Sequence, residues 1–126
     1  MANTYTQIYI HIVFSVKNWQ RQITNNFREE LYKYISGIMK NDGHKPLAIN
    51  GTSDHIHIFV GLDPNMSVSD TVRDIKSNSS KFINSRRFVK VKFEWQEGFG
   101  AFSYSHSQID SVVKYINNQD RNSIEK

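Results

Sequence analysis

The sequence predicts an α+β fold: a single domain, residues 1–126, with an antiparallel sheet and helices over one face of it. The first observation behind this prediction is the order of the periodic segments, which alternate along the chain as β, α, β, β, α, β, β, α. The second is length, because 126 residues can bury one hydrophobic core but are too few for two independent ones. A functional site is therefore expected within one fold or between copies of it.

The N-terminal part of the chain contains a strand pattern followed by a helix pattern. Polar and apolar residues alternate from Tyr5 to Phe14, which predicts the first strand. After a polar turn, residues 17–26, apolar side chains recur every three or four positions and predict a helix that ends before Gly43. The apolar residues of this helix are Phe27, Leu31, Tyr34, Ile35 and Ile38.

The middle of the chain predicts a pair of strands and a second helix. Residues 45–50 and 55–62 are short strand-like segments, and the polar loop between them suits a hairpin or a close antiparallel pair. Ser67 and Asp70 form a capping box ahead of an apolar stripe, so a second helix is expected from there to about Ser85.

The C-terminal part predicts two further strands and a last helix. Residues 89–95 and 99–104 are rich in β-branched and aromatic side chains and flank a glycine-containing turn. Ser107 and Asp110 provide another capping box, which predicts a helix that continues through Gln119.

Composition excludes several classes of protein and site. The chain has no cysteine, so disulfides, thiolate zinc sites and cysteine nucleophiles are all excluded. The segment Met1–Thr6 is polar, and no apolar stretch approaches the ~20 residues that a membrane-spanning helix needs. These features indicate a cytoplasmic protein.

Positive charge is concentrated in one region. The formal net charge is +4, yet residues 73–92 alone contain seven basic residues and one acidic residue. Such a zone suits a polyanionic partner, because Lys and Arg release counterions when they contact phosphates. A solvated helix face explains the zone equally well when it is considered alone. The candidate phosphate-binding residues are Arg73, Lys76, Lys81, Arg86, Arg87 and Lys90.

A predicted strand with two histidines is the first candidate for chemistry. Side chains two residues apart share one face of a strand, so His55 and His57 lie together while the isoleucines between and after them enter the core. Their Cα atoms would be ~7 Å apart, within reach of one metal ion. The alternative is an inert pair of surface histidines.

The last predicted helix carries the second candidate. Tyr115 and Gln119 are i, i+4 neighbours at the edge of its apolar stripe, so the phenol and the amide oxygen can converge on one centre. Without the histidines, Tyr115 would be better interpreted as a boundary aromatic whose hydroxyl meets water.

Three segments together form a recognisable pattern: the His-hydrophobe-His strand, the run Trp95–Ser105 and the segment Val113–Gln119. In this order and spacing they resemble the single-tyrosine HUH transposases of small bacterial insertion sequences, the TnpA type. The resemblance covers nearly the whole chain, including the opening segment Tyr9–Ser15. It implies a ferredoxin-like sheet, the HUH endonuclease fold, a homodimer, and single-stranded DNA with imperfect hairpins as the substrate.

The resemblance also implies roles for individual residues. His55 and His57 correspond to metal ligands, Gln119 to a third ligand, and Tyr115 to the nucleophile that forms a covalent 5′-phosphotyrosine. Imidazole ligands by themselves favour zinc or manganese. The family resemblance implies Mg²⁺ or Mn²⁺, and this is the prediction that we adopt.

Some positions bear on how the DNA is held. Trp95 or Tyr104 is expected to stack on unpaired bases, although core packing is the better interpretation of Trp95. Trp19 stands where the family often has a basic residue. The resemblance further implies that Tyr115 of one subunit can serve the histidines of the other.

Two other functions remain open at this point. A non-catalytic module that binds single-stranded nucleic acid explains the basic zone but leaves the histidine pair and Tyr115 without a role. A related HUH nickase, such as a replication initiator or relaxase, would use the same chemistry, but the short chain argues against it.

Overall fold

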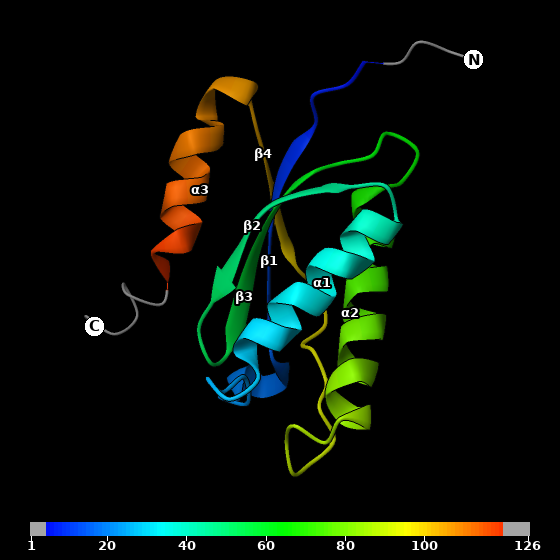
Figure 1. Cartoon of the computed structure of the whole chain (residues 1–126), viewed down its shortest axis with the longest axis vertical. Helices are drawn as coiled ribbons and strands as arrows, with labels where there is room; N and C mark the ends of the chain where they lie inside the picture. Colours follow the sequence, from blue (N-terminus) through cyan, green and yellow to red (C-terminus); the bar gives the residue numbers. More distant parts are fainter. Residues whose placement is uncertain (1–4, 120–126) are drawn as a thin grey trace.

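The computed structural model describes residues 5–119, which form a four-stranded antiparallel sheet and three α-helices (Figure 1). The elements are β1 Tyr9–Ser15, α1 Arg28–Asn41, β2 Lys45–Gly51, β3 His55–Gly61, α2 Val68–Ser85, β4 Gly100–Tyr104 and α3 Ile109–Asn117, with 3-10 turns at Lys17–Trp19 and His106–Gln108. The strand order is β2-β3-β1-β4. The predicted α+β class and antiparallel sheet are confirmed, and the first strand begins at Tyr9 rather than at Tyr5.

Helices α1 and α2 cover one face of the sheet. Leu31 and Ile35 of α1, together with Val72 and Ile75 of α2, are buried in one apolar cluster with Ile58 of β3. The buried positions of each helix recur every three or four residues, because such positions share one side of a helix. None of the helices within residues 5–119 is long and apolar enough to cross a membrane.

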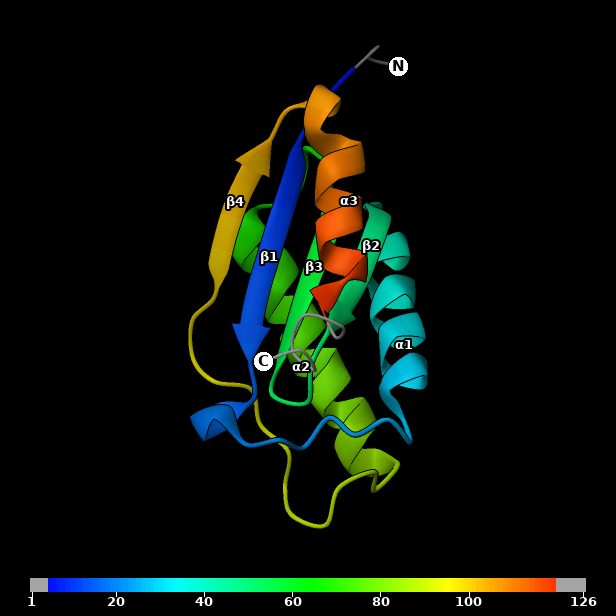
Figure 2. The same cartoon turned by 90° about the vertical axis from the view of Figure 1, so that its left-hand side faces the viewer.

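Helix α3 lies on the opposite face, which differs from the expectation that all helices share one face. Val112 and Ile116 pack there with Ala48 of β2 and Phe59 of β3 in a second apolar cluster. Figure 2 shows α3 along β2 and β3, while α2 lies behind the sheet. The reason is that the interior of β3, from Ile56 to Val60, is buried on both faces, so the sheet needs apolar cover on both sides.

The predicted strand at residues 89–95 is wrong. This segment is irregular, and its one bridge to the sheet joins Trp95 to Val16 at the end of β1. The side chain of Asn84 on α2 accepts a hydrogen bond from Phe93 N at 2.7 Å and donates one to Phe93 O at 3.1 Å. The backbone of this segment is therefore satisfied partly by α2 rather than by a neighbouring strand.

The last helix is capped two residues earlier than expected. Ser105 N donates to Gln108 Oε1 at 2.9 Å, and Gln108 N donates to Ser105 O at 3.0 Å. This pair forms a capping box around a 3-10 turn, and α3 then begins at Ile109. Ser107 and Asp110 are not the capping pair.

Candidate active site

The two histidines of β3 lie side by side on the face that α3 partly covers. His55 pairs with Ser15 of β1, and His57 pairs with Val13, so both point to the same side of the sheet. Their ring centroids are 5.0 Å apart, and the rings are nearly perpendicular. The strand thus presents two imidazoles that can approach a common centre.

His55 is held by its own loop. Its Nδ1 lies 2.7 Å from Asp54 Oδ1 and 2.9 Å from Thr52 Oγ1. Burial raises the pKa of Asp54, but hydrogen bonds from His55 and Thr52 outweigh this effect and leave the pKa below its usual value. The ionised carboxylate favours a proton on His55 Nδ1, which leaves Nε2 as the lone-pair nitrogen that a metal ion needs.

His57 is held by a third histidine, His11 of β1. His11 Nε2 lies 2.9 Å from His57 Nδ1, and the two rings stack with centroids 5.1 Å apart. His57 is only 7% exposed, and burial, with a smaller effect of the charges of His55 and His11, lowers its pKa to about 4. His57 is therefore neutral at pH 7, as a metal ligand must be. His11 reaches His57 through the pairing of β1 with β3, a contact that the sequence pattern does not predict.

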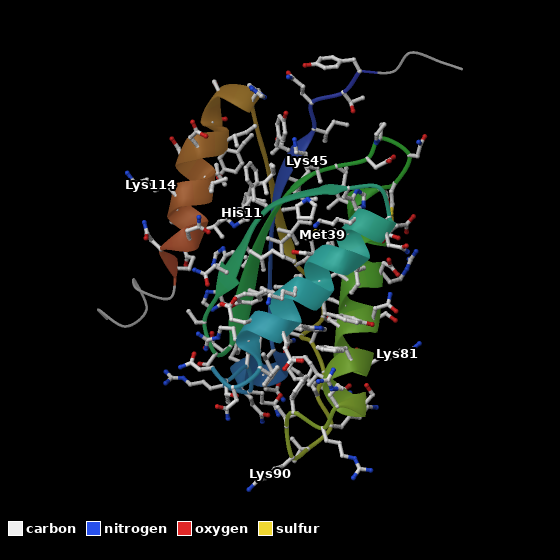
Figure 3. All side chains as sticks on the ribbon, viewed as in Figure 1. His11, Met39, Lys45, Lys81, Lys90 and Lys114 are labelled. Carbon is white, nitrogen blue, oxygen red and sulfur yellow. The ribbon has the colours of Figure 1, made fainter. Side chains whose placement is uncertain are left out.

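Tyr115 of α3 lies beside this histidine pair. Its ring centroid is 6.1 Å from that of His57 and 6.2 Å from that of His11, with edge-on geometry in both cases. The side chain is 54% exposed, so the phenol can meet a ligand from solvent. In Figure 3, His11 lies between the sheet and α3.

Two contacts fix the end of α3 at this position. Asn50 of β2, which pairs with His57 in the sheet, donates from Nδ2 to Ile116 O at 3.0 Å and to Asn117 O at 3.1 Å. These bonds use carbonyls that the end of a helix leaves without intrahelical partners. The last turn of α3, and Tyr115 with it, is thereby tied to the strand next to His57.

Gln119 follows one turn after Tyr115 and is 8% exposed. Its Nε2 donates to Tyr115 O at 3.4 Å, which does not consume the amide oxygen, the atom that ligates cations. Within residues 5–119, no group of three or more His, Cys, Asp or Glu is arranged to hold a metal ion. Two imidazole nitrogens and one amide oxygen nevertheless suit a divalent ion whose remaining ligands are phosphate and water oxygens.

The predicted phosphate-binding residues do not join the histidines, because α2 lies on the other face of the sheet. Lys76 Nζ donates to the carbonyl oxygens of Gln96 and Gly98 at 2.8 and 2.6 Å. Arg73 pairs with Asp70, and Arg86 with Glu30 of α1. Lys81, Arg87 and Lys90 are exposed, and Figure 3 shows Lys81 and Lys90 pointing outward.

The aromatic residues expected to stack on bases are engaged in the fold. Trp95 packs edge-on against Phe14 and Phe93, and its Nε1 donates to Ser79 Oγ at 3.0 Å. Core packing is thus the correct interpretation of Trp95. Tyr104 is half-buried against Phe59 in the cluster beneath α3. The exposed aromatic residues that share a cavity with the histidines are Trp19, Phe99 and Phe102.

Comparison with known proteins identifies the family. The family described as "Transposase IS200 like" matches residues 4–119. A candidate transposase from Deinococcus radiodurans R1 superimposes with a TM-score of 0.74 at 17% identity, covering 95% of this chain and 97% of that one. A REP-associated tyrosine transposase bound to a REP hairpin superimposes with a TM-score of 0.67 at 16% identity, covering 94% of this chain and 70% of that one.

Among curated protein sequences, none matches this chain. The family match nevertheless spans almost the whole sequence, and both structural likenesses extend over nearly all of the fold. The chain belongs to the IS200-like transposase family.

Proposed function

We propose that this transposase cleaves and rejoins single-stranded DNA through a covalent 5′-phosphotyrosine on Tyr115, with a divalent metal ion held at His55 and His57. The observation that carries the proposal is the position of Tyr115, whose ring lies 6.1 Å from that of His57 although 58 positions separate them in sequence. An imidazole pair and a solvent-accessible phenol are the groups that metal-assisted phosphoryl transfer to tyrosine requires.

His55, His57 and Gln119 are the residues proposed to hold Mg²⁺ or Mn²⁺. When bound, the ion would neutralise and orient the scissile phosphate. Asp54 and His11 hold the two imidazoles, since each contacts an Nδ1 atom and leaves Nε2 as the nitrogen for the ion. His11 and Asp54 are thus positioning residues.

In the proposed reaction the Tyr115 oxygen attacks the scissile phosphorus. The bond between phosphorus and Tyr115 oxygen forms as the bond to the 3′ oxygen of the DNA breaks, and the phenol proton passes to solvent. The released 3′ oxygen takes up a proton and becomes a free hydroxyl. In the reverse step another 3′ hydroxyl attacks the phosphotyrosine and releases Tyr115, so rejoining needs no ATP because the linkage is conserved.

The proposed substrate is single-stranded DNA with a hairpin near each end of the element, and the proposed assembly is a homodimer. The structural relative bound to a REP hairpin supports a hairpin substrate. Tyr115 lies beside His57 of its own chain, which supports a site built within one subunit. Exchange of the tyrosine between subunits, as the resemblance implied, stays a prediction.

A covalent-adduct assay tests the proposal. Labelled single-stranded DNA is incubated with protein and Mn²⁺, and a denaturation-resistant adduct is expected. Tyr115→Phe should abolish the adduct and leave DNA binding nearly intact, because only the attacking oxygen is lost. Undiminished cleavage by this variant would contradict the assignment of Tyr115 as the nucleophile. DNA binding with no adduct from the wild-type protein would instead favour a non-catalytic binding module.

A further inference from the structure

A cavity of about 660 Å³ opens directly beside the histidine pair. His55 and His57 form part of its wall, and Trp19, Phe99 and Phe102 supply aromatic surface. All three aromatic side chains are exposed, with 64% of Trp19 and 53% of Phe102 accessible to solvent. Exposed aromatic side chains gathered around one cavity mark a binding surface, because they contribute little to the core.

Trp19 is placed at the cavity by a strained turn. Both Asn18 and Trp19 have φ values of 57°, in the left-handed region that residues with side chains rarely adopt. Asparagine tolerates this region, whereas a bulky aromatic residue such as Trp19 adopts it only at an energetic cost. A bulky aromatic residue held this way is better explained by its position than by local preference.

The rest of the fold clamps this turn in place. Val16 N donates to Asp54 O at 2.8 Å, Lys17 N donates to Glu94 O at 3.0 Å, and Asn18 N donates to the side-chain oxygen of Gln96 at 2.8 Å. These bonds tie the turn to Asp54, which precedes His55, and to Glu94 and Gln96, so the backbone at Trp19 is held relative to the histidines. The surface is preorganised for a ligand, which reduces the entropy lost on binding.

Away from the two histidines, the chemistry of the walls suits a base better than a phosphate. Glu97 is the acidic residue among the described residues that line the cavity, and the described lining contains no Lys or Arg. A carboxylate repels phosphate but accepts hydrogen bonds from the exocyclic amino groups of bases. Aromatic faces stack on any unpaired base.

A neighbouring cavity accounts for the phosphates of the same strand. It lies between α2 and residues 92–99, shares the segment 96–99 with the first cavity, and includes Arg73, Lys76 and Lys81 in its lining. Its lining also contains Lys92 and the acidic residues Glu94 and Glu97, so four cationic side chains stand against two carboxylates and the net positive charge suits the DNA backbone. A single strand can therefore run from the histidines across the segment 96–99 toward α2.

We propose that Trp19, Phe99 and Phe102 form a stacking subsite for one unpaired base of the DNA strand, next to the phosphate cleaved at His55 and His57. The inference rests on the proposed function for the position of that phosphate. The subsite explains why an aromatic residue is exposed on a strained turn at the edge of the site.

Tryptophan fluorescence tests the subsite without cleavage. The chain has two tryptophans, and Trp95 is partly buried with its indole hydrogen-bonded, so the exposed Trp19 should respond most strongly to a stacked base. The Tyr115→Phe protein is titrated with eight-nucleotide strands of dT, dC or dA in Mg²⁺, while anisotropy of labelled strands reports affinity. Quenching should saturate together with binding.

Variants then assign the effect to the cavity. Trp19→Ala should weaken binding on the order of tenfold, the usual effect of one stacked base, whereas Trp19→Phe should retain most of the affinity. Phe102→Ala provides an independent loss of stacking surface at an exposed position. Tyr34→Ala is the matched control, because Tyr34 is an exposed aromatic on α1, on the other face of the sheet, and its loss should leave affinity unchanged. Circular dichroism checks that each variant is folded.

The outcomes separate the subsite from the catalytic proposal. If folded Trp19→Ala and Phe102→Ala bind short strands as well as the parent, the subsite is overturned even when Tyr115 still forms its adduct. If Trp19→Ala changes the oligomeric state but not DNA affinity, the cavity is an interface between copies and the subsite is likewise overturned. If stacking depends on Trp19 while the wild-type protein forms no adduct, the subsite stands and the catalytic proposal fails.

Discussion

The two faces of the sheet are built from the same strands but differ in what they present. On the face beneath α1 and α2, β1 and β3 contribute Ile12, Ile56 and Ile58, all fully buried among apolar neighbours. On the opposite face α3 covers β2 and β3 with Phe59 at the centre of a small apolar cluster, and the remaining area carries histidines. The comparison shows that one face stabilises the fold and that the partial cover of the other leaves room for a site.

Changes at adjacent residues of β3 test the difference between the two faces most directly. His57→Ala should abolish metal-dependent cleavage, because one remaining imidazole holds an ion poorly, while the protein stays folded. Ile58→Ala, one residue along, should lower the free energy of unfolding by about 2–5 kcal/mol and leave metal binding by the folded protein unchanged. Adduct assays and urea unfolding measure the two effects.

A chelator provides the control for this pair. Excess EDTA should reduce wild-type cleavage to the level of His57→Ala. It should shift the unfolding midpoint of either protein by no more than the stabilisation that the bound ion contributes. Full cleavage in excess chelator would refute the metal role.

Local sequence predicted the parts of the site that depend on periodicity. A period of two places His55 and His57 on one face, and a separation of four places Gln119 one turn after Tyr115, although α3 ends at Asn117 rather than continuing through Gln119 as predicted. These relations are properties of a single element, so they can be predicted before the fold is known.

The parts that were missed depend on which elements meet. His11 contacts His57 only because β1 pairs with β3, 46 residues away, and its own strand pattern carries no trace of that pairing. The strand predicted around Phe93 fails because Asn84 of α2 takes its backbone hydrogen bonds. The position of α3 likewise follows from the need to cover a second face of the sheet, which the amphipathic stripe alone does not specify.

His11 offers a smaller change within the polar face. His11→Phe should keep the stacked shape but remove the nitrogen that holds His57 Nδ1, and metal affinity should fall about 10- to 100-fold. Mn²⁺ binding followed by EPR measures the affinity, and NMR of the ring nitrogens reports whether His57 still carries its proton on Nδ1.

His106→Phe is the matched control for this test. His106 is an exposed histidine that contacts Tyr9 rather than the pair, so its loss should leave Mn²⁺ affinity unchanged. Unaltered affinity and an unaltered His57 tautomer in His11→Phe would show that His11 only fills space.

The polar face should also lose stability in acid more readily than the apolar face. Burial lowers the pKa of His57 from 6.5 to about 4. Between these pH values His57 is therefore protonated in the unfolded chain but neutral in the folded protein. Stability is therefore fully present above pH 6.5 and falls as the pH drops toward 4, by roughly 1–2 kcal/mol from this residue after allowance for solvent screening.

Comparison with His57→Gln isolates this contribution. Asp42 of the α1–β2 turn has a pKa raised to about 6, first by a hydrogen bond with Asp74, and it acts in the opposite sense, losing its stabilising effect as the pH rises. Both proteins contain that pair, so it cancels in the difference between their unfolding free energies. An equal decline of both proteins between pH 6.5 and 4 would contradict the assignment.

The smallest effect is expected from variants that test whether DNA also reaches the α2 side of the molecule. Lys81 of α2 and Lys90 of the loop that follows it point outward (Figure 3). If the strand continues from the site to α2, each lysine that contacts a phosphate contributes about 0.7 to the slope of log affinity against log salt for single strands. Lys81→Ala combined with Lys90→Ala should then reduce this slope by about 1.4, with similar effects on all sequences. Lys81→Arg with Lys90→Arg should keep this slope, because the charge is retained.

Lys114 of α3 gives the complementary test on the face of the sheet that carries Tyr115. A slope that responds to Lys114→Ala but not to the Lys81 and Lys90 variants would confine the DNA to the face that carries the histidines.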